Sequence, residues 1–169
     1  TCYKMGSVEQ RHAVLQGLLD TDGTVDKTGC TIQYYTVSSQ LADDVEYLIR
    51  SLGGVTRRSV KKTARQPCHV LTVRLPKSLA PFRLARKTQR FTSPYKYNPS
   101  RAIVDVALVG RKPVQCIKVD ADDQLYVTDD FIVTHNTIEA IGFINAKPEI
   151  RRVLVVCPAS IKLNWRNEL

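Results

Sequence analysis

The chain is short of acidic residues, paired cysteines and long apolar runs. Asp and Glu number 16 against 25 Lys and Arg, giving a net charge of +9, and this surplus favours a polyanionic partner such as nucleic acid. None of the 5 cysteines forms a C-x-x-C pair, which argues against a zinc or disulfide framework and fits a reducing cytoplasm. No apolar run approaches the roughly 20 residues of a membrane span, and no signal peptide is recognisable. We therefore expect a cytoplasmic protein with no membrane partner.

Helix and strand patterns alternate through the first 98 residues. Apolar residues spaced by three and four predict helices over residues 9–21 and 40–52, the second capped by Ser38 or Ser39. Residues 31–37, 55–62 and 70–75 are predicted strands because β-branched and aromatic residues dominate them. Residues 78–87 are a predicted short helix. The segment is expected to follow the order αββαββα, an α+β fold.

The first predicted helix ends in an acidic turn. Residues 15–23 read L-Q-G-L-L-D-T-D-G, a string that resembles the nine-residue signature of the LAGLIDADG homing endonucleases. The resemblance implies that two such helices approach each other closely at Gly17. It also implies that Asp22 binds Mg²⁺ at the scissile phosphate, while Asp20 has a structural or capping role. The residues expected on and around the shared helix face are Leu15, Leu18 and Leu19.

Basic side chains cluster on and beside the second predicted strand pair. They are Arg57, Arg58, Lys61, Lys62 and Arg65. The resemblance implies a twisted sheet that lies on double-stranded DNA, so these side chains are expected to reach phosphates and base edges; a solvated basic edge strand is the alternative. The family also places a lysine near the cleavage centre, and spacing does not choose between Lys61 and Lys62. Only one signature copy is present, whereas inteins usually carry two and single-copy enzymes dimerise.

The composition changes over residues 99–136, which are almost wholly strand-like. Strands are predicted over residues 102–109, 114–119 and 125–128, with turns at 110–113 and 121–123. The segment ends at His135 and Asn136, and Thr137 follows. An Asn amide can attack its own backbone carbonyl and cut the chain after itself, and a preceding His can polarise that carbonyl or protonate the leaving amine. A Thr at the new N-terminus supplies a hydroxyl nucleophile.

This stretch, with a V-x-x-I-x-V strand, an acidic turn and a final T-H-N-T, resembles the C-terminal splicing motifs of inteins. Cys116 together with Thr134 further resembles the third mechanistic class, in which the motif cysteine attacks the upstream peptide bond. The resemblance implies that Cys116 forms a branched thioester and that Thr134 orients it. Acyl transfer to Thr137 and cyclisation of Asn136 would follow, without a cofactor. A buried strand cysteine or an accessory group is the alternative for Cys116.

Residues 137–169 have a third character. A helix is predicted over residues 138–146 and a continuously apolar strand over 151–158, the kind found in a buried parallel sheet. The string C-P-A-S-I-K-L-N-W over residues 157–165 resembles SWI/SNF-type helicase-like ATPases. The resemblance implies a RecA-like α/β piece of an interrupted host, in which Thr137 is the magnesium-binding Thr of the phosphate loop. ATP with Mg²⁺ would then be bound only by the spliced host.

Three parts are therefore predicted in one α+β chain. They are a LAGLIDADG-type half over residues 1–98, a β-rich Hint-type splicing segment over 99–136 and the C-extein over 137–169. The predicted activities are protein splicing and site-specific cleavage of double-stranded DNA. The predicted partners are DNA and a missing N-terminal intein half with its N-extein, since the chain starts at Thr1. The alternatives are a stand-alone DNA endonuclease or DNA-binding remnant, and a helicase-like ATPase defined by its host.

Overall fold

A computed structural model describes a large part of the chain. The described residues are 2–92, 96–105, 107, 110, 119–123, 125–134, 152 and 166. The chain divides into two units, residues 1–101 and residues 102–169, which are described separately below.

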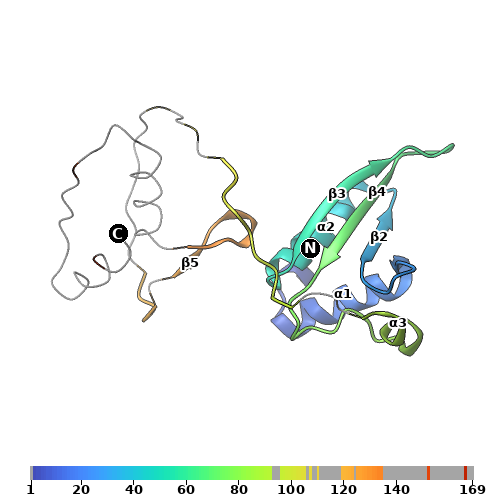
Figure 1. The fold of residues 1–169 in the computed structure, drawn as a ribbon, viewed down its shortest axis with the longest axis horizontal. Helices are drawn as coiled ribbons and strands as arrows, with labels where there is room; N and C mark the ends of the chain where they lie inside the picture. The colour runs from blue at the N-terminus through green and yellow to red at the C-terminus, as the bar shows by residue number, and fades with distance from the viewer. Residues whose placement is uncertain are drawn as a thin grey trace. The chain divides into compact units, whose positions relative to one another are not determined.

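The first unit contains an antiparallel four-stranded sheet and its helices (Figure 1). Its elements are the 3₁₀ helix η1 (Cys2–Met5), α1 (Val8–Asp22), β1 (Gly23–Val25), β2 (Ile32–Thr36), α2 (Ser39–Ser51), β3 (Val55–Lys61), β4 (Cys68–Arg74) and α3 (Ala85–Arg90). From α1 onward the order is αββαββα, which confirms the order expected from the sequence. The strands lie side by side as β1-β2-β4-β3.

Both long helices begin at a serine cap. At α1, the Ser7 side chain accepts a hydrogen bond from the backbone N–H of Gln10, whose own side chain accepts from the N–H of Ser7. This reciprocal pair satisfies N–H groups that the first turn leaves unpaired. At α2 the cap is Ser38, whose hydroxyl accepts from the N–H of Leu41 at 3.2 Å. Ser38 is thus the cap among the two serines that the sequence offered.

One sheet face carries the hydrophobic core, and α1 and α2 pack against it (Figure 1). Side chains alternate between the two faces of a strand, so Ile32 and Tyr34 of β2 point to this face. Across the ladder they oppose Val73 and Leu71 of β4. The helices supply further members of the same cluster: Leu15, Leu19, Val45 and Ile49. The intervening residues of each strand lie on the opposite face.

The predicted helix over residues 78–87 was placed too early in the chain. The helix α3 spans Ala85–Arg90 instead, and residues 75–84 form turns and irregular backbone. Pro81 lies within the predicted range and lacks the N–H that a helix interior needs. The helix begins after Leu84 because the N–H groups before it bind Asp20, far away in the sequence.

In the second unit, β5 (Tyr126–Val127) and β6 (Val133–Thr134) pair as a short antiparallel hairpin. The predicted strand at 125–128 is therefore confirmed in its centre, and residues 121–123 form the expected bend and turn. Asp130 and Phe131 at the hairpin tip have φ values of 61° and 57°, which are unfavourable for residues with a side chain. The predicted strand at 102–109 is not found in its described residues, 102–105 and 107. Ile103 and Val104 there are 79% and 94% exposed, and no strand among the described residues pairs with them.

Among the described residues, no helix has the length and apolar character needed to cross a membrane.

Candidate functional site

The last residue of α1 is Asp22, and its side chain is exposed. The chain reverses immediately afterwards at Gly23. A Cβ on Gly23 would lie 2.4 Å from the carbonyl oxygen of Leu19 and 2.9 Å from its Cα. Only glycine permits so close an approach, so this residue lets the sheet begin directly after the acid. The turn presents the Asp22 carboxylate at the edge of the sheet, where β1 starts.

Asp20 has a different task from Asp22. Its carboxylate accepts hydrogen bonds from the backbone N–H groups of Arg83 at 3.1 Å and Leu84 at 3.3 Å. One and two turns earlier on the same side of α1, Gln16 and His12 contact the carbonyl oxygen of Ala80. This polar side of α1 therefore fixes the segment that leads into α3. Asp20 therefore fixes the residues just before that helix, which is a structural role as expected for it.

Lys87 of α3 lies against the end of α1. Its ammonium group donates hydrogen bonds to the carbonyl oxygens of Leu19 at 2.9 Å, Asp20 at 2.8 Å and Gly23 at 2.5 Å. A cation at the carbonyl end of a helix is favourable. Burial lowers the pKa of Lys87 and the Arg86 guanidinium lowers it further, whereas the carboxylates of Asp20 and Asp22 act in the opposite direction. The lysine beside the acidic end of α1 is thus one that the sequence analysis missed.

Neither lysine expected at this place lies there. Gly23 is level with Tyr34, Leu71 and Arg58 across the four strands, and Lys61 is three residues further along the far edge strand β3. With strands about 4.8 Å apart and a rise of about 3.4 Å per residue, its Cα is about 18 Å from that of Gly23. Lys62 follows Lys61, away from the acid. Identifying the lysine nearest to Asp22 requires the strand order of the sheet, which the spacing of residues along the chain does not reveal.

Behind the acid, the phenol of Tyr34 is fully buried. Its hydroxyl has no hydrogen-bond partner among the described residues. Burial raises the pKa of Tyr34, and the Asp22 carboxylate raises it further. Tyr34 pairs with Gly23 across the ladder, so it lies beside the residue that follows Asp22. It is a second residue near the acid that the sequence analysis did not single out.

The side of α1 that turns away from the sheet is open around Gly17. Nothing lies within 4 Å of a Cβ built on this glycine, and Val14, one turn earlier, is 36% exposed. A bare helix surface centred on glycine allows another helix to approach closely. Leu15 and Leu19, which were expected on and around that shared face, are instead fully buried in the core of this unit. Leu18 is only partly buried against the same core.

A polar row crosses the sheet face that is opposite to α1 and α2. The register pairs Thr24 with Gln33, Gln33 with Thr72, and Thr72 with Arg57. These four side chains therefore stand side by side across all four strands, and each is half-buried or exposed. We call Thr24, Gln33, Thr72 and Arg57 the polar row. Except for Arg57, its members were not identified from the sequence, although the alternation with buried Ile32 and Tyr34 pointed to them.

Four of the five predicted DNA-contacting residues are exposed. Arg57 and Lys61 share the face of the polar row, since Arg57 belongs to the row and Lys61 is four residues after it on β3. Lys62 and Arg65 lie in the turn between β3 and β4, at the free tip of a hairpin that extends beyond the rest of the sheet (Figure 1). These four cations can reach a polyanion on this side of the unit.

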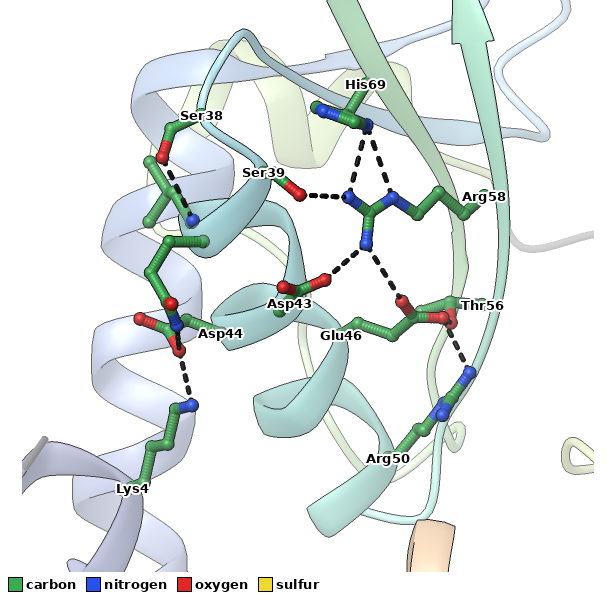
Figure 2. Close-up of polar contacts among 12 residues, drawn as sticks. Lys4, Ser38, Ser39, Asp43, Asp44, Glu46, Arg50, Thr56, Arg58 and His69 are labelled. Atoms are coloured by element: carbon green, nitrogen blue, oxygen red, sulfur yellow. Dashed lines mark hydrogen bonds and ion pairs between the residues drawn. The ribbon is translucent and has the colours of Figure 1, made fainter.

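Arg58, the fifth predicted residue, points to the other face. Figure 2 shows its guanidinium between α2 and β4, where it pairs with Asp43 and lies 3.9 Å from Glu46. It also donates to the hydroxyl of Ser39 at 3.1 Å and to Nδ1 of His69 at 3.1 Å. Because neighbouring residues of a strand face opposite sides, Arg58 attaches the hairpin to α2, and we exclude it from the candidate DNA interface.

A metal site of protein groups alone is absent from the described residues, where no three acidic, His or Cys side chains gather. The carboxylate of Asp22 is exposed and accepts a hydrogen bond from the Thr21 hydroxyl at 3.4 Å. Mg²⁺ is commonly held by one or two carboxylates together with substrate phosphates and water. Asp22 therefore fits one part of such a site, and a nucleic-acid phosphate and a second acid would complete it.

Of the predicted splicing residues, only Thr134 is among the described ones. It belongs to β6, is half-buried and is paired with Tyr126 of β5. Cys116, His135, Asn136 and Thr137 lie outside the described residues. Their roles stay predictions.

Comparison with known proteins identifies the first unit. Residues 9–82 match the LAGLIDADG-like domain family. This range contains α1, the whole sheet and α2, and it includes Asp22 and the polar row. Residues 9–82 are therefore a LAGLIDADG-like domain, as the signature string indicated.

A replicative DNA helicase DnaB of Mycobacterium intracellulare is 35% identical over 156 residues. The match covers 86% of this chain and 27% of that protein, so the chain spans about a quarter of the relative's length. The matched region of 156 residues is longer than the LAGLIDADG-like domain, which occupies residues 9–82. The relative is a replicative helicase, so the SWI/SNF type expected from residues 137–165 is not supported. The comparison supports only a relationship with a helicase.

Proposed function

We propose that the first unit is one half of a DNA endonuclease and that an intein interrupting a helicase carries it. The observation that carries the proposal is the position of Asp22. This exposed acid ends α1 at the edge of a sheet whose free face holds the polar row and the cations Arg57 and Lys61. A sheet face placed on duplex DNA would bring the end of α1 to the sugar–phosphate backbone at the border of the contact.

Each group at this end has a defined part in the proposal. Asp22 holds a divalent cation, which would neutralise charge on the scissile phosphate. Lys87 keeps the carbonyl end of α1 in place and adds a positive charge close to the acid. The basic residues on β3 and its turn bind phosphates of the flanking DNA. The open surface at Gly17 accepts a second helix of the same type, which brings the second acid.

Substitution of Asp22 by asparagine tests this proposal in the full-length precursor, which supplies the second helix. Asp22→Asn is isosteric and removes one anion, so DNA binding should be unchanged or slightly stronger, while magnesium-dependent cutting should be lost. Asp105→Asn removes an exposed carboxylate of the second unit and serves as the matched control, with cutting retained. Undiminished cutting by Asp22→Asn would show that this half contributes no catalytic acid.

The same precursor is proposed to splice itself. The support is the sequence of residues 114–137 together with the β5–β6 hairpin, which leads through Thr134 directly to His135. Cys116 attacks the upstream peptide bond, and its thioester passes the acyl chain to the Thr137 hydroxyl. The Asn136 amide nitrogen then attacks its own carbonyl carbon, which breaks the bond to Thr137. An O-to-N shift finally joins the flanking segments by a peptide bond.

Mass spectrometry of the expressed precursor separates these steps. Asn136→Ala cannot form a succinimide, so no free fragment beginning at Thr137 should appear. Cys116→Ala should abolish cleavage at the upstream junction, while Asn136 can still cyclise. Wild-type amounts of the Thr137 fragment from Asn136→Ala would refute the first assignment. A branched precursor formed by Cys116→Ala would show that Cys116 only packs.

The interrupted host is proposed to be a helicase-like ATPase. The support is the helicase relative, whose match covers 86% of this chain. In this proposal ATP and Mg²⁺ are bound only after splicing, when Thr137 joins the completed phosphate loop. The precursor should then bind no ATP, and the ligated product should bind it.

A further inference from the structure

The side chains of Gln33 and Tyr35 are joined on the free sheet face. The Tyr35 hydroxyl donates a hydrogen bond of 2.7 Å to the carbonyl oxygen of the Gln33 amide. Both belong to β2, an inner strand, and they stand two residues apart and thus on one face. Both are half-buried. The amide of Gln33 is therefore held in one orientation before any ligand arrives.

This hydrogen bond decides which way the amide faces. A glutamine side chain has several rotatable bonds, and ordering it costs conformational entropy. The hydrogen bond from Tyr35 already orders the Gln33 side chain in the free protein. The amide oxygen faces Tyr35, and the NH₂ group points away from it. The carbonyl oxygen has a second lone pair, so the amide still offers one donor and one acceptor side by side.

The neighbours of Gln33 leave it accessible. Its cross-strand partners are Thr24 on one side and Thr72 on the other, which are both short and uncharged. At the end of the polar row stands Arg57, an exposed cation. Three strand spacings make the row about 14 Å wide, comparable to the major groove at about 12 Å. The amide is thus central in a strip of donors and acceptors that fits one groove of B-DNA.

The chemistry of the amide selects one base. In the major groove adenine presents the N6 amino group as donor and N7 as acceptor, which is the complement of a carboxamide. Guanine presents two acceptors there, O6 and N7, so it would oppose the amide oxygen. We propose that Gln33 reads one adenine in the major groove and that Tyr35 is its positioning residue. This inference rests on the proposed contact between the sheet face and DNA.

Selection from a pool of randomised duplexes tests the inference without knowledge of the target. The precursor and its Gln33→Ala, Gln33→Glu and Tyr35→Phe variants are each used to retain duplexes, and the retained sequences are aligned. The aligned sequences retained by the wild type should contain a position at which adenine is preferred, called the adenine column. In Gln33→Ala that column should lose its preference while the others persist, and affinity for the wild-type site should fall about 5- to 150-fold, the range for one bidentate base contact. Tyr35→Phe keeps the ring and should weaken the same column only.

Two further variants distinguish base reading from loss of structure. Gln33→Glu has two acceptors and should move the column from adenine to cytosine, whose N4 amino group is a donor. Arg57→Ala should weaken binding yet keep the adenine column. The inference is overturned if the adenine preference survives in Gln33→Ala, or if the wild type shows no adenine preference. If the proteins still retain duplexes in either case, the proposed DNA binding itself stands. Failure of every protein to retain duplexes overturns the proposed function together with the inference.

Discussion

Replacing Lys87 by methionine removes a single cation that joins α3 to the end of α1. Methionine keeps much of the length of the side chain and its apolar stem, so the change mainly removes the ammonium group. The carbonyl oxygens of Leu19, Asp20 and Gly23 then lose a donor. Asp22 next to them loses a neighbouring positive charge. We expect a lower free energy of unfolding of the first unit.

The magnitude follows from two opposing effects. A hydrogen bond to a charged group contributes about 1.5–3 kcal/mol to the free energy of unfolding. The sum of three such bonds is an upper limit for the loss in Lys87→Met, and the expected loss is well below it. Desolvation of the ammonium, which lowers the pKa of Lys87, already offsets part of this gain. In addition, Asp20 is half-buried and Asp22 exposed, so water can reach the carbonyls after the substitution. We therefore expect a loss of about 2–3 kcal/mol, roughly the contribution of one charged hydrogen bond.

Equilibrium denaturation in urea, followed by circular dichroism at the helix band, measures this loss. Lys27→Met is the matched control, because Lys27 is an exposed lysine in the turn between β1 and β2, and it should change stability by less than about 0.5 kcal/mol. Lys87→Arg should be intermediate, since a planar guanidinium cannot aim three donors as the ammonium does. A change below about 0.5 kcal/mol in Lys87→Met would refute the reasoning.

Four other substitutions, three in the same region and one in α2, test further parts of the first unit. Gly23→Ala should lower the free energy of unfolding by about 1–3 kcal/mol because its Cβ meets the α1 backbone. Gly17→Ala should raise the free energy of unfolding by about 0.5–1 kcal/mol. The same change in melting temperature for the two variants would contradict both predictions. Tyr34→Phe removes a buried hydroxyl without a partner among the described residues and should leave stability unchanged or raise it by about 1 kcal/mol, so a clear loss would show an undetected partner. Asp44 is buried and contacts Lys4 and Tyr3, which hold its pKa below the ordinary value; its contribution is present above the unfolded pKa of about 3.9 and is lost as pH falls through the lower folded pKa. Asp44→Asn should thus be about 1.5–3 kcal/mol less stable at neutral pH, with a gap that narrows below about pH 4, and a gap of constant size would exclude this linkage.

Helices and strands of the first unit were largely predictable because their signals are local. Apolar spacing located α1 and α2, and β-branched runs located β2, β3 and β4, each to within a residue or two of their bounds. The exceptions are β1, for which no residue range was predicted, and α3. The start of α3 depends on Asp20, a residue about sixty positions earlier that accepts hydrogen bonds from the N–H groups of Arg83 and Leu84. A hydrogen bond between residues so far apart in the chain leaves no pattern in neighbouring residues.

The acidic half of the candidate site was predictable and the cationic half was not. The signature string located Asp22 because the chemistry lies within nine consecutive residues. The partner lysine could not be found in this way, because the distance between Lys61 and the acid depends on the strand order β1-β2-β4-β3. Lys87 reaches the acid through a helix that contacts β1 rather than through the sheet. Spacing along the chain contains neither fact.

The adjacent arginines of β3 show how a basic run divides between function and stability. Arg57 and Arg58 are chemically identical, and charge counting treats them as one patch. Strand alternation sends Arg57 to the free face beside Thr72 and sends Arg58 to Asp43 and Glu46 on α2 (Figure 2). The acids of α2 thus neutralise the cation that faces inward and leave its neighbour to act on a polyanion. Because a shift of one residue in register would exchange the two positions, the pairing of β3 with β4 sets which arginine lies on the face proposed to contact DNA.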